Sequence, residues 1–163
     1  ERGFFCETWN KKAMLSEGLD FDFVQDNYSF SVDAGTLRGL HLQNPPHAQD
    51  KLVRCGRGAL FDVAVDVRTN SPTYGQWFGQ ELSFENGKQM LIPKGCLHGF
   101  MTLTRKCELI YKCSDYYAQN CEAEVAWNDP DIGIQWPEFA SVVISEKDKL
   151  AGSLADLNSA FRI

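Results

Sequence analysis

A histidine lies between two basic residues in a segment whose composition is typical of a β-strand. The segment is Leu37-Arg38-Gly39-Leu40-His41-Leu42-Gln43, and Lys51 begins the next apolar stretch. The unperturbed pKa of histidine lies close to neutrality, so His41 can accept a proton at physiological pH. Arg38 and Lys51 could bind an anionic substrate and stabilise an oxyanion that forms beside that base. The pattern predicts proton abstraction from an activated carbon, with a structural histidine hydrogen-bonded in the core as the alternative.

The number and spacing of the histidines argue against a metal centre. The chain has His41, His47 and His98, so a three-histidine site is arithmetically available. Strand-borne metal sites usually place two histidines on one face through H-x-H or a similarly close spacing. Here Gln43 stands two residues after His41, and His47 follows the loop residues Pro45-Pro46. We therefore expect no metal.

Other polar residues could contribute to the same site. His98 follows the turn Pro93-Lys94-Gly95, where a glycine lets backbone or a ring approach a ligand closely. Tyr111 lies in a strand context and would act as an acid only if its hydroxyl reached a pocket with a neighbouring charge. Asp62 and Asp66 share one face of a predicted strand. We expect these two carboxylates to be solvated, with a barrel lumen as the alternative.

A framework of short strands must position these residues. Residues 59–67 alternate between two faces with the period of a strand, and further strands are predicted over 76–83, 89–92, 99–103, 108–112 and 124–127. Asn86-Gly87 predicts a two-residue hairpin turn. Many short strands in a chain of this size indicate a sandwich, a jelly roll or a barrel.

Helical periodicity is confined to the C-terminal part of the chain. From Leu150 to Phe161, leucines and a phenylalanine recur at spacings of three and four. Ser145 is a suitable N-cap for this segment. We therefore expect an amphipathic helix over 146–161 to close an otherwise all-β fold.

Composition and charge exclude several classes of protein. The chain has 163 residues, 44% hydrophobic and 23% charged, which suits one folded domain over 1–163. A net charge of -6 argues against non-specific nucleic-acid binding. No apolar run approaches the roughly 18 residues of a membrane span, and no signal peptide precedes Arg2. The six cysteines include no C-x-x-C pair, so we expect reduced thiols and a cytoplasmic protein.

Short segments along almost the whole chain match one family pattern. They include Arg2-Gly3-Phe4-Phe5-Cys6-Glu7, His98-Gly99-Phe100 and Trp127-Asn128-Asp129-Pro130, together with residues 23–27, 37–43, 49–54, 62–68, 71–75, 92–95 and 145–148. In this order and spacing the chain resembles the dTDP-4-dehydrorhamnose 3,5-epimerases. The resemblance implies a cupin-type jelly roll with a short C-terminal helix. It also implies epimerisation at C3 and C5 of a nucleotide-linked 4-keto-6-deoxy sugar through an enolate.

The resemblance further implies a role for each of five residues around the sugar. His41 matches the catalytic base, and Asp148 matches the carboxylate that pairs with it. Tyr111 matches the tyrosine that acts on the opposite face of the sugar. Lys51 would stabilise the enolate, and His98 would line the same pocket.

Substrate binding and assembly are also implied by the resemblance. Arg38 matches a diphosphate-binding position. Nucleotide contacts are expected at Arg2, Phe5, Glu7, Gln25, Asn27 and Tyr116. Members of the family form homodimers that exchange N-terminal strands, so some of these contacts would come from the neighbouring subunit. They need neither a metal nor another cofactor.

Two departures from the family pattern leave the exact substrate open. Leu42 replaces a common aromatic residue, and Cys96-Leu97 replace the commoner Phe-Ala before His98. We expect both positions to line the sugar pocket. The alternatives are a 3- or 5-monoepimerase or a ketoisomerase acting on a dTDP-, GDP- or CDP-sugar, and, as a different class, a non-catalytic sugar-binding cupin. Retention of His41, Lys51 and the other acid–base residues argues against a mere binding module.

Overall fold

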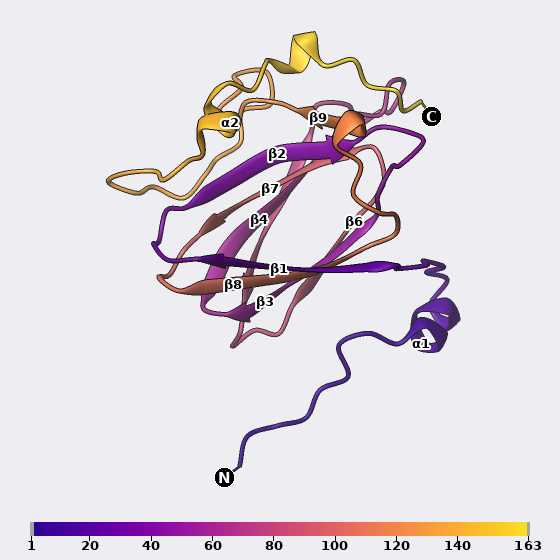
Figure 1. Ribbon diagram of the computed structural model, residues 1–163, viewed down its shortest axis with the longest axis vertical. Coiled ribbons are helices and arrows are strands. Elements are labelled where there is room, and N and C mark those ends of the chain that lie inside the picture. Colours follow the sequence, from indigo (N-terminus) through magenta and orange to yellow (C-terminus); the bar gives the residue numbers. More distant parts are fainter. Residues whose placement is uncertain (1, 163) are drawn as a thin grey trace.

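The computed structural model describes residues 2–162, which form two facing antiparallel sheets (Figure 1). The small sheet has the order β1-β8-β3-β6, with β1 at Gln25–Ser31, β8 at Cys107–Cys113, β3 at Lys51–Arg57 and β6 at Gln89–Ile92. The large sheet has the order β5-β4-β7-β2-β9, with β5 at Trp77–Ser83, β4 at Ala59–Asp66, β7 at Cys96–Thr102, β2 at Leu37–Gln43 and β9 at Glu122–Glu124. This arrangement is the predicted all-β jelly roll of the cupin type.

Two apolar cores lie on opposite faces of the large sheet. The first fills the space between the sheets and includes Val53, Leu60 and Phe100. The second includes Val63 and Val65, and it is covered by the C-terminal residues beyond β9, which run along the far side of the large sheet in Figure 1. The alternation predicted for residues 59–67 is thus confirmed, because even-numbered and odd-numbered residues of β4 enter different cores.

The turn at Asn86-Gly87 is not the predicted hairpin. The strands on either side of it belong to different sheets, since β5 pairs with β4 and β6 pairs with β3. The Asn86 side chain accepts hydrogen bonds from the backbone N–H groups of Ser83 and Lys88. Gly87 has a φ of 60°, a conformation that glycine adopts readily. The local turn signal was correct, but the chain uses the turn to cross between sheets.

The predicted helix over 146–161 is also wrong. Only α2, Glu146–Lys149, and the 3₁₀ turn η2, Leu154–Asp156, form there, and Leu150 is exposed. Backbone groups that would bond to one another within a helix bond to the coil segment around Asp129 instead. The N–H of Leu154 donates to Asp129 Oδ2, and the carbonyl of Gly152 accepts from Ala126. Leu154 then joins the second core without forming part of an amphipathic helix.

The remaining helical elements are short. The helix α1, Lys11–Ser16, was not predicted because it buries no residue and so carries no apolar period. The 3₁₀ turn η1, Gln119–Cys121, leads into β9. Within residues 2–162, no helix combines the length and apolar character needed to cross a membrane.

Candidate active site

A cavity opens between the two sheets and contains the residues that the sequence singled out. One lobe has a volume of about 280 Å³ and is lined by Arg38, His41, Lys51, His98, Tyr111 and Asp148, among others. A second lobe of about 340 Å³ shares His41, Lys51 and Tyr111 with the first and extends to Gln25, Asn27, Tyr117 and Glu122. The fold therefore gathers two histidines, three other ionisable side chains from both sheets and the carboxylate of α2 around one space.

His41 and Asp148 form a hydrogen-bonded pair at this cavity. His41 Nε2 lies 2.6 Å from Asp148 Oδ1, and Asp148 is buried. Ser145 caps α2 as predicted, and its hydroxyl donates to Asp148 Oδ2. A carboxylate at Nε2 holds the ring proton there, which leaves Nδ1 as the basic nitrogen. Burial lowers the pKa of His41, although Asp148 opposes this effect. The imidazole is therefore neutral and able to accept a proton at pH 7.

An irregularity in β2 brings Arg38 and His41 to the same cavity. In a regular strand these positions, three apart, would point to opposite faces of the sheet. Here the step from Arg38 to His41 spans three residues, whereas the matching step on β7 from Phe100 to His98 spans two. This extra residue is characteristic of a β-bulge. Gly39 is required at this point, because a Cβ there would lie 2.6 Å from the carbonyl oxygen of His98 and φ is +110°.

Lys51 and Tyr111 face His41 from the opposite sheet. They lie on adjacent strands, with Val53 paired to Tyr111 and Lys51 paired to Cys113. Burial raises the pKa of Tyr111, so its hydroxyl keeps a proton that it can donate. Burial lowers the pKa of Lys51, whereas neighbouring Cys113 and Asp62 act in the opposite direction. His41, which can accept a proton, and Tyr111, which can donate one, thus lie on opposite sides of one cavity. The Lys51 amine comes from the same sheet as Tyr111.

Comparisons with known proteins identify the family of this chain. The family model for dTDP-4-dehydrorhamnose 3,5-epimerase matches residues 1–156. The chain belongs to this family. The enzyme of that name from Sinorhizobium fredii is 50% identical over 161 residues, which cover 99% of this chain and 83% of the relative.

Two solved structures show the same fold. The dTDP-6-deoxy-D-glucose-3,5-epimerase of Legionella pneumophila, in complex with dTDP-4-keto-L-rhamnose, has a TM-score of 0.93 at 45% identity, covering 97% of this chain and 84% of its own. The dTDP-4-dehydrorhamnose 3,5-epimerase of Bacillus anthracis, with TDP and pyrophosphate bound, has a TM-score of 0.91 at 46% identity, covering 94% and 87%. The chain is thus an isomerase of the epimerase class with the family's jelly-roll fold.

A second histidine–carboxylate pair lies deeper in this epimerase fold. His98 Nε2 is 2.8 Å from Asp62 Oδ1, and both side chains are buried. The expectation that Asp62 is solvated is therefore wrong. The same holds for Asp66, which is buried and forms an ion pair with Arg68. Burial opposes the ionisation of Asp66, but hydrogen bonds from Arg68 and neighbouring hydroxyls hold its pKa well below the usual range. Asp62 shares its strand face with Leu60 and Ala64, which face the core between the sheets.

The expected nucleotide contacts are only partly gathered in a single chain. Gln25 and Asn27 line the second lobe. Arg2, Phe5 and Glu7 lie in the exposed N-terminal segment, and Tyr116 is also exposed. The adjacent Tyr117 lines the second lobe in its place.

Some lining residues were not anticipated, and one expectation about the sugar pocket fails. Ser29, Ser145 and Lys147 line the first lobe. Leu42 lines the second lobe as expected. Leu42 and Leu97 both belong to the second core, but Leu97 lines neither lobe, and Cys96 lines a separate cavity beside β5 and β6. Because neighbouring residues of a strand point to opposite faces, His98 and Leu97 cannot both reach the same pocket.

Proposed function

We propose that this epimerase inverts C3 and C5 of a dTDP-linked 4-keto-6-deoxy sugar. The observation that carries the proposal is the placement of His41 and Tyr111 on facing sheets around one cavity. Inversion requires a proton to leave one face of the ring and another to arrive on the opposite face. A base and an acid on one sheet could not serve both faces of a bound ring.

The chemistry follows from the ketone at C4, which acidifies the protons on C3 and C5. His41 removes one of these protons through Nδ1, and Asp148 stabilises the imidazolium that results. The negative charge passes to the C4 oxygen, where the Lys51 ammonium stabilises the enolate. Tyr111 then protonates the carbon from the other face. His98 lines the same lobe, held in orientation by Asp62.

Binding of the nucleotide part is assigned to the second lobe and to Arg38. Gln25 and Asn27 supply amide groups there, and Gln25 Nε2 donates to Asn27 Oδ1. Arg38 lines the first lobe and supplies a guanidinium suited to a diphosphate. The sugar ring then lies between His41 and Tyr111.

Deuterium uptake tests this function directly. The protein is incubated in heavy water with dTDP-4-keto-6-deoxyglucose and, in parallel, with the GDP- and CDP-linked analogues, and the products are followed by NMR. We expect deuterium at both C3 and C5 and inversion at both carbons with the dTDP sugar. Exchange at one carbon alone would show a monoepimerase, and binding without any exchange would show a non-catalytic protein.

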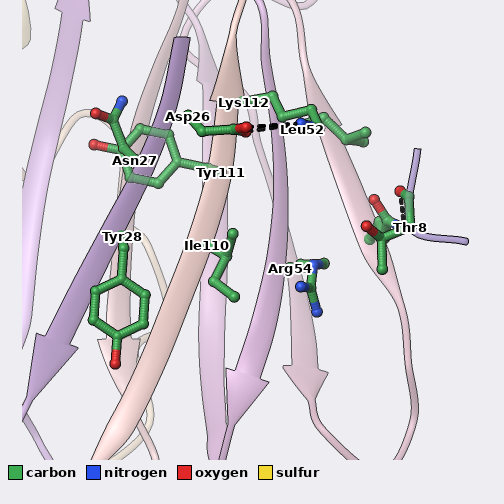
Figure 2. Close-up of a pocket in the computed structure, with 10 residues that line it drawn as sticks. Thr8, Asp26, Asn27, Tyr28, Leu52, Arg54, Ile110, Tyr111 and Lys112 are labelled. Atoms are coloured by element: carbon green, nitrogen blue, oxygen red, sulfur yellow. Dashed lines mark hydrogen bonds and ion pairs between the residues drawn. The ribbon is translucent and has the colours of Figure 1, made fainter. Parts of the chain in front are cut away.

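We also propose that two copies form a homodimer through the outer face of the small sheet and exchange N-terminal strands. Tyr28 and Phe30 are exposed on this face of β1, and Phe5 is 96% exposed. A groove of about 320 Å³ lies there, and Figure 2 shows Thr8, Tyr28, Arg54 and Ile110 among the side chains that line it. Apolar side chains exposed together on one sheet face favour burial by a partner. A second copy would also bring Arg2, Phe5 and Glu7 to the neighbouring site.

Deletion of residues 1–7 is expected to weaken both dimerisation and dTDP binding. The deletion removes the exposed phenylalanines and the proposed nucleotide contacts while leaving every strand in place. Sedimentation equilibrium and calorimetric titration with dTDP would measure the two effects. Leu150→Ser, which changes an exposed leucine elsewhere, is the control and should leave both unchanged. A truncated protein that stays dimeric and binds dTDP normally would contradict the exchange.

We propose a cytoplasmic location for this protein, with residues 1–163 acting as one domain. All six cysteines fall within the described residues and have free thiols. Free thiols are typical of a reducing compartment. The C-terminal segment packs on the large sheet and shares its core, which supports a single folding unit.

A further inference from the structure

A third ionisable side chain approaches the His41–Asp148 pair from β9. Glu124 is the register partner of His41 across β2 and β9. A carboxylate oxygen of Glu124, a ring nitrogen of His41 and a carboxylate oxygen of Asp148 all lie within 4.8 Å of one another. The Glu124 Oε2 atom is buried and accepts no hydrogen bond from any described residue. A buried oxygen without a hydrogen bond is costly, so packing alone does not explain its position.

Lys147 connects this carboxylate to the helix that carries Asp148. Its Nζ lies 3.6 Å from Glu124 Oε2 and 2.7 Å from Glu122 Oε2. The hydrogen bond to Glu122, with the charge of Glu124 in addition, raises the pKa of Lys147, which stays protonated. Burial is the main cause of the lowered pKa of His41, and the positive charge of Lys147 adds to it. The two glutamates thus pair with a cation that opposes protonation of His41, and their charges partly offset it.

We propose that Glu124 is a positioning residue of the His41–Asp148 pair, stabilising the imidazolium with its carboxylate and offsetting the positive charge of Lys147 beside the ring. The inference rests on the proposed role of His41 as the base. When His41 takes a proton from the sugar, the ring becomes a cation close to two carboxylates, those of Asp148 and Glu124. An opposite charge within about 4–6 Å favours the charged form of an ionisable group.

The two routes by which Glu124 acts have the same sign. Loss of its charge removes an attraction to the imidazolium. It also removes one of the two carboxylates paired with Lys147, so that the positive charge beside His41 is less compensated. Both effects make His41 a weaker base. Asp148 alone would still hold the tautomer, because its hydrogen bond to Nε2 does not involve Glu124.

The test is the titration of His41, followed by NMR of protein with isotope-labelled histidines. The signal that disappears in His41→Asn identifies His41. Glu124→Gln keeps the shape of the side chain and removes its charge. We expect this variant to lower the pKa of His41 by about one unit. In the active enzyme, the acidic limb of the pH profile of kcat/KM should then move to lower pH by the same amount, because a weaker base loses its proton at lower pH.

Two matched variants separate this effect from general charge loss. Glu146→Gln makes the same change on α2, at a side chain that is 87% exposed and paired with Lys149, and should leave the pKa of His41 unchanged. Glu122→Gln releases Lys147 by the other route and should lower the pKa of His41 by less than Glu124→Gln does. Glu124→Asp keeps the charge, so the pKa of His41 in this variant should stay close to its wild-type value.

Each outcome decides the role of Glu124 independently of turnover. A Glu124→Gln shift no larger than that of Glu146→Gln would overturn the proposal. A shift equal to that of Glu122→Gln would show that Glu124 acts only through Lys147, which overturns its assignment to the pair. The titration needs no substrate, so a protein without epimerase activity would refute the proposed function and still report on Glu124. If the wild-type enzyme were active and Glu124→Gln left the pKa of His41 unchanged, only the role of Glu124 would be refuted.

Discussion

Replacement of His41 with asparagine is expected to abolish epimerase turnover while the jelly roll stays folded. His41 is the one histidine whose ring borders both lobes of the cavity, and its Nδ1 is the basic nitrogen of the pair with Asp148. Loss of a general base typically costs about 10²–10⁴-fold in rate, and more where no substitute exists. Deuterium exchange into the sugar should disappear at C3 and C5 alike, because the same base serves both carbons.

The matched control for this variant is His47→Asn. His47 is half-exposed, lines neither lobe and pairs with Asp115 at 3.4 Å. The same substitution there should leave turnover unchanged. Thermal unfolding of both variants would show that the fold is retained. A folded His41→Asn protein that kept a tenth of normal activity would remove His41 from the role of base.

The pH dependence of the wild-type enzyme follows from the same residue. Burial lowers the pKa of His41 below its ordinary value of 6.5. The base is therefore active above this lowered pKa and is lost as pH falls through it. The acidic limb of kcat/KM should lie below that of an ordinary solvent-exposed histidine.

Tyr111→Phe is expected to separate proton exchange from inversion. Only the hydroxyl is lost, so the ring should keep its packing against the core between the sheets. His41 can still abstract a proton and return deuterium to the same face of the sugar, so the substrate should acquire deuterium, particularly at C5. Fully inverted product should be scarce, because the donor on the opposite face is missing.

Tyr74→Phe provides the control for the loss of a phenol. Tyr74 lies in a loop outside both lobes and should give normal product. If Tyr111→Phe formed product at the normal rate, the acid would have to be another group. If exchange and product formation fell equally, one residue would act in both steps, which would refute the division between base and acid.

Local patterns in the sequence determined the elements and the kind of site. The period of two over 59–67 predicted a strand with two distinct faces, and Ser145 marked the start of α2. The types and spacing of Arg38, His41 and Lys51 indicated a base beside cations. These features depend on neighbouring residues, whose backbone conformations and side-chain directions repeat regularly. The resemblance to a family added Asp148 to the set and gave Tyr111 its expected role, and both residues lie far from His41 in the chain.

Only the tertiary structure decided which of these residues meet. The β-bulge beside Gly39 places Arg38 and His41 in one cavity, although regular alternation would separate them. The pairing of Asp62 with His98 joins residues on adjacent strands. Residues 150–162 form no long helix, because backbone groups from Gly152 to Leu154 bond to the coil around Asp129. In each case a contact between segments distant in sequence determined the outcome, and the periodicity of a single segment carries no record of its partner.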